Sequence, residues 1–327
     1  MTQAIQFISA FLLSLIVTFV LEKKFIPALM RIKMGQFILD IGPRWHKSKE
    51  GTPTMGGIFF ISGITLAFLV TGLYSAVKFK SYSALVVLIS ALMFGVIGFI
   101  DDYTKFVKKQ NKGLSAKAKL ILQLFVTAIF LYFMRSLGYI DTAIDLPFTD
   151  KTLELGIIYY VLSIFFISFI VNSVNLTDGI DGLAGSVTLV VTVFYSALAF
   201  KAFDMPSLSL LGAVAGGLCS FLYYNINPAK IFMGDTGSLF LGGLVVGVAY
   251  QLNCELIILF VGLWYVVEAL SVVLQVFSFK VFKKRIFKMS PIHHHFEMCS
   301  WSEHRIVRTF SIFTALMCVV AYFAFIY

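Results

Sequence analysis

The sequence predicts an all-α polytopic integral membrane protein with about ten transmembrane helices. Hydrophobic residues make up 59% of the 327 residues, above the roughly 45–50% that is usual in globular chains. Charged residues make up only 13% and lie in clusters. Apolar windows comparable to the roughly 20 residues that cross a bilayer recur along the whole chain. Together, these observations argue against a soluble fold.

The expected spans follow one another with short connections, at 4–22, 55–77, 82–100, 119–137, 155–173, 184–201, 208–225, 237–252, 254–280 and 305–326. The first is not expected to be a cleavable signal peptide, because no positive charge precedes it and EKK follows it. The ninth is long and contains Glu268 and Gln275, so we expect it to be broken, tilted or partly outside the bilayer. The connection around 138–154 is long enough for a small hairpin. We expect residues 1–327 to form a single domain.

The distribution of Lys and Arg predicts the orientation, because basic connections stay in the cytoplasm. Most of the 26 such residues lie in or beside the alternate connections 23–54, 101–119, 174–183, 226–236 and 280–308. The other side holds only Lys78, Lys80, Arg135, Lys151 and Lys201. The first set is therefore expected to face the cytoplasm. With an even number of spans, both termini then lie outside, on the periplasmic or extracellular side.

Topology also accounts for the formal net charge of +9, so nucleic-acid binding is not predicted. A basic inner face favours anionic lipid headgroups and phosphorylated substrates. The four cysteines have no CxxC spacing, and neither a disulfide framework nor a zinc site is expected. The polar motifs gather in the inner connections, which predicts an active site formed by cytoplasmic loops.

The stretch FGVIGFIDDYTK ends an apolar run on two adjacent carboxylates, Asp101 and Asp102. Adjacent carboxylates tolerate each other best near a divalent cation, and Mg²⁺ is usually held by one or two carboxylates together with substrate phosphates. Lys105 lies one helical turn after Asp101, and Lys117 belongs to a basic stretch that follows. An amphipathic loop whose lysines contact lipid phosphates would explain the lysines equally well. It would not explain the pair of adjacent carboxylates.

Two further motifs place polar groups at helix ends. GTPTMGG follows Lys49 and contains Thr54, and it offers backbone N–H groups and hydroxyls to an anion. An ordinary capped helix start would have the same composition. In VNSVNLTDGIDGLAG, four polar side chains recur at a spacing of three, on one face of a helical segment: Asn172, Asn175, Asp178 and Asp181.

The remaining motifs are NINPAKIFMGDTGSL and SPIHHHFE. Asp235 begins a span and is either a helix N-cap or a metal ligand, while Phe232 suits stacking on a flat ring. The Asp-Thr-Gly-Ser tetrapeptide resembles an aspartic-protease motif, but the second loop that such a protease needs is absent. His293, His294 and His295 are adjacent and cannot all face one way. Phosphate or polar substrate groups suit them better than zinc, which lacks a usual ligand set here.

Taken in order, GTPTMGG, GFIDDYTK, NLTDGIDGLAG, FMGDTGSL and SPIHHHFE resemble the phospho-N-acetylmuramoyl-pentapeptide transferase family over essentially the whole chain. The resemblance implies transfer of phospho-MurNAc-pentapeptide from UDP-MurNAc-pentapeptide to undecaprenyl phosphate, giving lipid I and UMP. It also implies a Mg²⁺ requirement, a homodimer and a place in the bacterial cytoplasmic membrane. This reaction is the first membrane step of peptidoglycan synthesis.

The roles expected for individual residues combine the residue patterns with this resemblance. We expect Asp235 to be the principal metal ligand, with Asp101 or Asp102 close by. Asp101 either deprotonates or orients the lipid phosphate, or acts as a covalent nucleophile. Lys105 and Lys117 would neutralise phosphate charge, and His293 is a further catalytic candidate. The substrate-binding candidates are Lys49, Thr54, Asn172, Asn175, Asp178, Asp181, Asn225, Phe232, His294 and His295; the uridine end would be lined by Asn175, Asp178, Asp181, Asn225 and Phe232.

Two rival functions fit part of the pattern. A related enzyme would transfer N-acetylhexosamine-1-phosphate to the same lipid, but SPIHHHFE favours the muramoyl-pentapeptide branch. A secondary transporter would also be polytopic, yet transporters tend to carry ionisable residues near the midplane on two repeated halves. Here the carboxylates of the polar motifs lie at inner helix ends, Glu268 lies within a span as an exception, and no repeat is visible.

Overall fold

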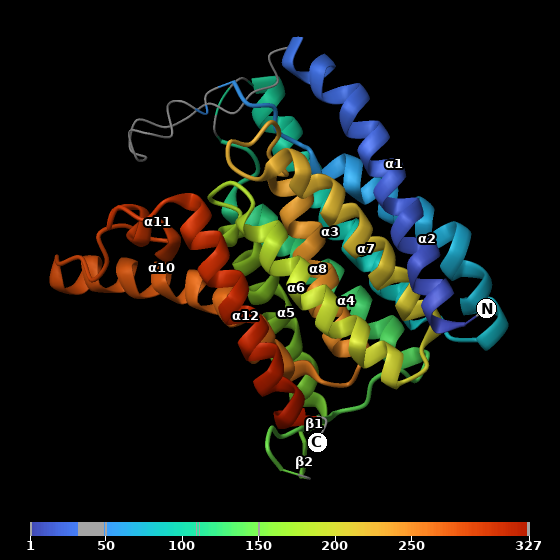
Figure 1. The fold of residues 1–327 in the computed structure, drawn as a ribbon. Coiled ribbons are helices and arrows are strands. Elements are labelled where there is room, and N and C mark those ends of the chain that lie inside the picture. Colours follow the sequence, from blue (N-terminus) through green and yellow to red (C-terminus); the bar gives the residue numbers. More distant parts are fainter. Residues whose placement is uncertain are drawn as a thin grey trace.

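The computed structural model describes residues 2–31, 49, 51–108, 110, 112–149 and 151–325, and these form a bundle of long helices (Figure 1). By length and composition, nine helices in the described ranges can cross a membrane. They are α1 (Gln3–Arg31), α2 (Gly57–Phe79), α3 (Ser83–Lys108), α4 (Ala116–Ser136), α5 (Ile157–Thr177), α6 (Leu183–Lys201), α7 (Met205–Asn225), α10 (Leu263–Phe282) and α12 (Glu303–Phe325). The polytopic all-α class is confirmed.

The predicted span 237–252 corresponds to α8 (Gly234–Gln251), which is helical but is not among the nine candidate membrane-spanning helices of the described ranges. Its first turn carries Asp235, Thr236 and Ser238, and it contains several glycines. Every residue of α8 from Thr236 to Gln251 is buried. Because protein rather than lipid surrounds this helix, its side chains need not match the hydrocarbon core.

The predicted span 254–280 is broken, as expected. The 3₁₀ helix η2 (Glu255–Ile257) and the short α9 (Ile258–Val261) precede α10, and Gly262 separates α9 from α10. In Figure 1, α10 runs across the direction of the bundle and projects from its side together with α11 (Ile292–Glu297). The short hairpin predicted between the fourth and fifth spans is also present. It pairs β1 (Ala143–Asp145) with β2 (Thr152–Glu154) in antiparallel register.

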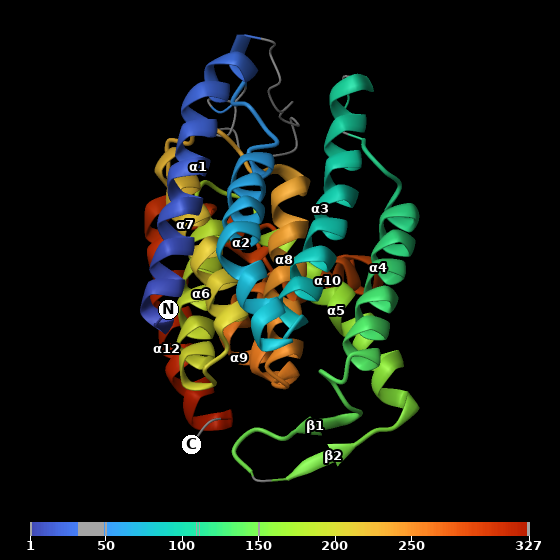
Figure 2. The same ribbon diagram turned by 90° about the vertical axis from the view of Figure 1, so that its right-hand side faces the viewer.

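Helix α7 and helix α8 form the centre of the bundle. Helix α7 packs against α1, α2 and α6, while α8 packs against α3 and α5. Helix α4 completes this side of the bundle by packing on α3 and α5 (Figure 2). The ends of α3, α4, α5 and α8 that carry the polar motifs consequently meet in one place.

Local sequence sets the helix ends near this place. The Ser115 side chain accepts a hydrogen bond from the Ala118 N–H and so begins α4. Both chain ends lie in the lower half of Figure 1, and the loop before α8 lies in the upper half. The side of the membrane on which each end lies stays a prediction.

Candidate active site

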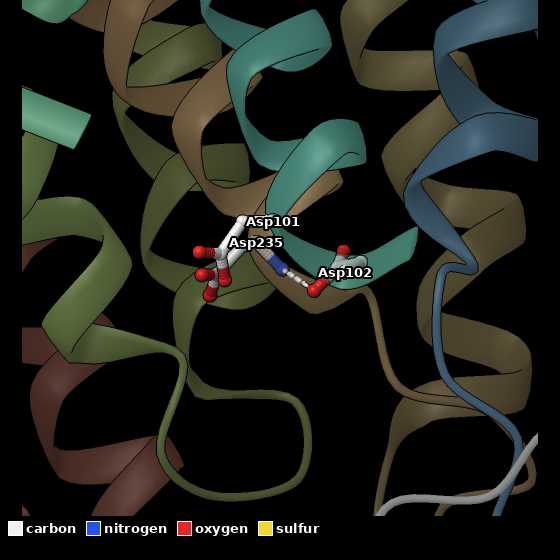
Figure 3. A group of neighbouring side chains, drawn as sticks. All are labelled: Asp101, Asp102 and Asp235. Carbon is white, nitrogen blue, oxygen red and sulfur yellow. Dashed lines mark hydrogen bonds between the residues drawn. The ribbon is translucent and has the colours of Figure 1, made fainter. Parts of the chain in front are cut away.

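Three carboxylates from two helices converge at the polar end of the bundle. Asp101 and Asp102 come from α3 and Asp235 from the first turn of α8, and each offers an oxygen within 4.8 Å of the others. Figure 3 shows the Asp101 and Asp235 side chains alongside each other, whereas Asp102 turns toward the backbone of α8. The two aspartate motifs, which lie far apart in the sequence, are thus neighbours in space.

A close contact between α3 and α8 makes this convergence possible. A Cβ atom at Gly98 would lie 2.1 Å from the carbonyl oxygen of Asp235, which is far inside van der Waals contact. Only glycine lets the two backbones approach this closely. One turn later on α3, Asp101 and Asp102 reach the start of α8.

Two ammonium groups neutralise Asp235. The Lys105 Nζ lies 2.6 Å from a carboxylate oxygen of Asp101 and 3.1 Å from Oδ2 of Asp235. The Lys119 Nζ lies 3.0 Å from the same Asp235 oxygen. The other oxygen of Asp235 accepts a hydrogen bond of 2.9 Å from the Asn175 amide. Lys105, which the sequence predicted for this place, is therefore part of the cluster.

The structure brings Lys119 to Asp235, whereas the side chain of Lys117 is exposed, and the predicted role of Lys117 toward substrate phosphates stays a prediction. Lys119 and Gln123 lie one turn apart on α4 and contact Asn175 and Asn172 of α5. The one-turn spacing of Lys119 and Gln123 on α4 matches the one-turn spacing of the two asparagines on α5. This match is a sequence pattern that could have identified Lys119 as a site residue. Lys117 precedes Lys119 by two residues and consequently lies on the other side of the helix.

We expect Lys119→Ala to lower turnover about 100-fold, because it removes a positive charge beside the three carboxylates, where the motif resemblance implies that phosphate groups react. Lys117→Ala is the matched control on the same helix and should leave turnover nearly unchanged. Steady-state rates of both purified variants check this expectation. The assignment fails if the two variants lose activity equally, or if only Lys117→Ala loses it.

Asp102 holds the start of α8. Its oxygens accept hydrogen bonds from the Asp235 N–H at 3.2 Å, the Thr236 N–H at 2.9 Å and the Thr236 hydroxyl at 2.7 Å. Gly234 adopts a φ of 71°, and a Cβ there would lie 2.6 Å from an Asp102 oxygen. A carboxylate at a helix N-terminus satisfies unpaired backbone donors. The geometry thus gives Asp102 a positioning task that the sequence patterns did not suggest.

Lys49 joins the loop after α5 to the start of α12. Its Nζ lies 2.7 Å from Oδ1 of Asp181 and 2.6 Å from a carboxylate oxygen of Glu303. The other oxygen of Asp181 accepts hydrogen bonds of 3.0 Å from the Asn227 amide and the Ala229 N–H. Both oxygens of Asp181 are therefore engaged, and Glu303 is a partner that the sequence patterns missed.

Two of the predicted asparagines tie structural elements together. Asn225 is buried; it accepts a hydrogen bond from the Gly182 N–H and donates one to the Ile231 carbonyl. Asn172 exchanges hydrogen bonds with Gln123 of α4. Its side chain thus binds α4, whereas Asn175, one turn later on α5, reaches Asp235.

Thr54 and Phe232 lie in two segments that run side by side. The Phe232 N–H donates to the Pro53 carbonyl at 2.8 Å, and the Gly56 N–H donates to the Phe232 carbonyl at 2.8 Å. The Phe232 ring is half-buried. The Thr54 hydroxyl lies close to Gly234, since a Cβ there would be 3.1 Å from it. The GTPTMGG motif is consequently adjacent to the carboxylate cluster.

Asp178 lies in the loop directly after α5, near the cluster. Burial, followed by the negative charges of Asp235 and Asp102, raises the pKa of the Asp178 carboxyl well above its usual range. The raised pKa shifts this carboxyl toward its protonated form, which can donate a hydrogen bond. Asp178 therefore suits hydrogen bonding to a neutral polar group better than it suits binding a cation.

The three histidines have separate partners. His293 is fully buried, with its Nδ1 3.0 Å from Oε2 of Glu268 and its Nε2 against Gly179. Nδ1 of His294 lies 2.6 Å from Oε2 of Glu297. Nδ1 of His295 accepts from the Lys288 N–H at 3.1 Å. As the sequence indicated, they do not face one way; His293 lies against the loop that carries Asp178, without touching the three carboxylates.

The donor set of the cluster suits a hard divalent cation. Among the described residues, these three aspartates are the one group of three or more His, Cys, Asp or Glu side chains that lie close enough together to hold a metal ion. The Lys105 ammonium lies between Asp101 and Asp235, in contact with both. This position already attracts a cation, and carboxylate oxygens are the ligands that Mg²⁺ prefers.

Comparison with known proteins identifies the family. The model for Glycosyl transferase family 4 matches residues 84–253, and signature 1 of phospho-N-acetylmuramoyl-pentapeptide-transferase matches residues 49–61. A phospho-N-acetylmuramoyl-pentapeptide-transferase of Clostridium botulinum (strain Alaska E43 / Type E3) is 46% identical over 321 residues, covering 97% of this chain and 96% of that protein. The chain belongs to the phospho-N-acetylmuramoyl-pentapeptide transferase family.

Other relatives with the same name support the same family assignment. The transferase of Clostridium novyi (strain NT) is 44% identical over 316 residues, with 96% of this chain and 95% of that protein covered. The transferase of Clostridium kluyveri (strain NBRC 12016) is 46% identical over 299 residues, with 91% and 92% covered. The family resemblance stated from the motifs is confirmed. The matched signature begins at Lys49 and includes Thr54, and the region matched by the larger family model includes all three clustered aspartates.

Proposed function

We propose that this transferase moves phospho-MurNAc-pentapeptide from UDP-MurNAc-pentapeptide to undecaprenyl phosphate at the cytoplasmic membrane surface, in the first membrane step of peptidoglycan synthesis. The observation that carries the proposal is the carboxylate cluster with its two lysines at the polar end of the bundle. A water-soluble nucleotide sugar and a membrane-anchored phosphate can meet only at such an interface.

The proposed reaction exchanges one phosphoanhydride for another. An oxygen of the lipid phosphate forms a bond to the β-phosphorus of the donor. The bond between that phosphorus and the oxygen bridging it to the α-phosphate breaks, and UMP leaves with the electron pair. The lipid then carries the sugar through a diphosphate. Because both reactants are anions, positioning and charge neutralisation supply most of the catalysis.

Several residues of the chain have tasks in this scheme. Lys105 and Lys119 neutralise the charge of the approaching phosphates, and Lys105 also holds Asp101 beside Asp235. Asp101 faces the attacking lipid phosphate. When bound, Mg²⁺ would supply charge neutralisation on the diphosphate, and Asp235 and Asp101 are the residues that we propose hold it.

The donor end is proposed to lie where the loops after α5 and before α8 meet. Phe232, half-buried, offers a face for the uracil ring. Asp178, whose raised pKa favours the protonated form, is proposed to donate a hydrogen bond to a uridine or sugar acceptor. Asp181 and Asn225 hold these loops through hydrogen bonds. Lys49, Thr54 and His294 are proposed to contact the phosphates or the sugar-peptide, while the fully buried His293 is proposed to act by positioning the loop that carries Asp178.

Asp102→Asn should weaken the start of α8 without removing a metal ligand. Loss of charge-assisted hydrogen bonds to Asp235 and Thr236 should lower the free energy of unfolding by about 1.5–3 kcal/mol, and turnover should fall. The affinity for Mn²⁺, measured by electron paramagnetic resonance as a Mg²⁺ substitute, should stay close to wild type. Loss of Mn²⁺ binding in Asp102→Asn would show that this carboxylate is a ligand.

The products test the proposed reaction. Purified protein, undecaprenyl phosphate, UDP-MurNAc-pentapeptide and Mg²⁺ should give UMP and the lipid diphosphate-linked sugar-peptide in equal amounts, identified by mass spectrometry. EDTA should stop both. Release of UMP without the lipid product would indicate hydrolysis and would contradict the transfer.

A further inference from the structure

A cavity of about 590 Å³ lies beside the start of α12, apart from the carboxylate cluster. Its lining includes Asp181, His304, Arg305 and Arg308. Asp181 belongs to the loop that also carries Asp178, so one wall of the cavity is shared with the proposed donor site. The two arginines have no part in the scheme above.

The acidic groups of this wall are already neutralised. Asp181 accepts from Lys49, Asn227 and the Ala229 N–H. Glu303, at the first position of α12, is paired with Lys49. An added cation would find no unpaired carboxylate oxygen on Asp181 here. The charge left facing the cavity is therefore that of the arginines.

Arg305 and Arg308 lie three residues apart on α12 and are exposed on one face of the helix. In the described part of the chain, no carboxylate lies within ion-pair distance of either. The Arg305 guanidinium stacks 4.0 Å from the ring centre of Trp301, which packs against Phe296 of α11. Stacking fixes the guanidinium plane and leaves its N–H groups free to donate.

We propose that Arg305 and Arg308 bind a carboxylate of the peptide carried by the donor substrate. Paired guanidinium groups match carboxylate geometry with parallel hydrogen bonds. A five-residue peptide ends in a carboxylate and spans roughly 17 Å when extended, so it reaches well beyond the diphosphate. This inference rests on the proposed function, because it assigns the peptide part of the same substrate.

Lipid phosphates have the same anionic chemistry and are the other possible occupant. Basic residues at a membrane surface attract anionic headgroups. The shared wall favours the peptide, since Asp181 lines this cavity and also belongs to the loop that we place against the donor. The two sources differ in which reactant the arginines affect.

The test compares donor binding with and without the peptide. Titration calorimetry with the full-length purified protein gives Kd for UDP-MurNAc-pentapeptide and for UDP-MurNAc. The double variant Arg305→Gln/Arg308→Gln should bind the pentapeptide donor about tenfold more weakly and bind UDP-MurNAc as wild type does. Arg285→Gln, at an exposed position between α10 and α11, is the control and should change neither Kd.

Other outcomes overturn the inference. An equal loss for both donors would place the arginines on the nucleotide or in the fold, and a raised KM for undecaprenyl phosphate alone would place them on the lipid phosphate. Unchanged affinity for both donors would remove them from substrate binding. Turnover of the pentapeptide donor by the wild-type protein is measured in parallel. No turnover by the wild-type protein would refute the proposed function itself. Wild-type turnover, together with a double variant whose affinities for the two donors change equally or not at all, would refute only the arginine site.

Discussion

Asp235→Asn should lower turnover on the order of 1,000-fold, because it removes charge from the centre of the electrostatic network. Asp235 is in contact with Lys105, Lys119 and Asn175. The amide keeps the size of the side chain but attracts neither ammonium group nor a divalent cation as strongly. Steady-state rates over a Mg²⁺ titration measure the effect, and the Mn²⁺ affinity should fall together with turnover.

The matched control for this variant is Asp145→Asn, an exposed carboxylate in β1. It should leave both turnover and Mn²⁺ affinity unchanged. Near-normal activity of Asp235→Asn, with wild-type Mg²⁺ dependence, would contradict the role of Asp235 as a metal ligand.

Gly98→Ala should lower turnover by about 100-fold, since a displacement of about 1 Å in a reacting constellation has that effect. The added methyl group would lie 2.1 Å from the Asp235 carbonyl oxygen, so α3 and α8 must move apart. Asp101 and Asp102 would then separate from Asp235. The variant should also need more Mg²⁺ for half-maximal activity.

Gly95→Ala is a close control for Gly98→Ala. Gly95 lies one turn earlier on α3, and its added Cβ would meet its nearest atom, in Phe240, at the ordinary contact distance of 3.4 Å. We expect near wild-type activity and Mg²⁺ dependence from this variant. The importance of the close contact at Gly98 would be disproved by equal behaviour of the two variants, provided that both have similar melting temperatures.

Much of the fold follows from composition and hydrophobic runs. A bilayer demands long apolar helices whose backbone groups are satisfied internally, so the long spans are visible in the sequence. Helix α8 is the instructive case, because its polar first turn and its glycines lower its hydropathy while protein surrounds it. From its length and polarity, the ninth apolar segment was expected to be broken, tilted or partly outside the bilayer; it is broken, and the position of the break at Gly262 was not predicted.

The site was harder to predict, because it depends on which residue of a stretch faces its neighbours. The motifs identified the three aspartates and Lys105, but they did not separate Lys119 from Lys117. That choice depends on where Ser115 begins α4. Nor can a sequence show that Asp102 turns toward the N–H groups of α8 while Asp101 turns toward Lys105. Both carboxylates are equivalent until the helices are packed.

The pairs of residues that join distant segments were also invisible in the sequence. Lys49 and Glu303 stand at opposite ends of the chain and meet beside Asp181. Glu268, an exception among the carboxylates in the sequence, contacts buried His293. Such contacts depend on the relative placement of α10, α11 and the loops, which no local pattern encodes.

The most direct test of the central claim is UMP release by the purified protein with undecaprenyl phosphate, Mg²⁺ and either UDP-MurNAc-pentapeptide or UDP-GlcNAc. We predict release with the pentapeptide donor alone, and its complete loss in EDTA. Release with UDP-GlcNAc in its place would keep the chemistry of the carboxylate cluster but contradict the proposed donor. No release with either donor would contradict the proposed transfer.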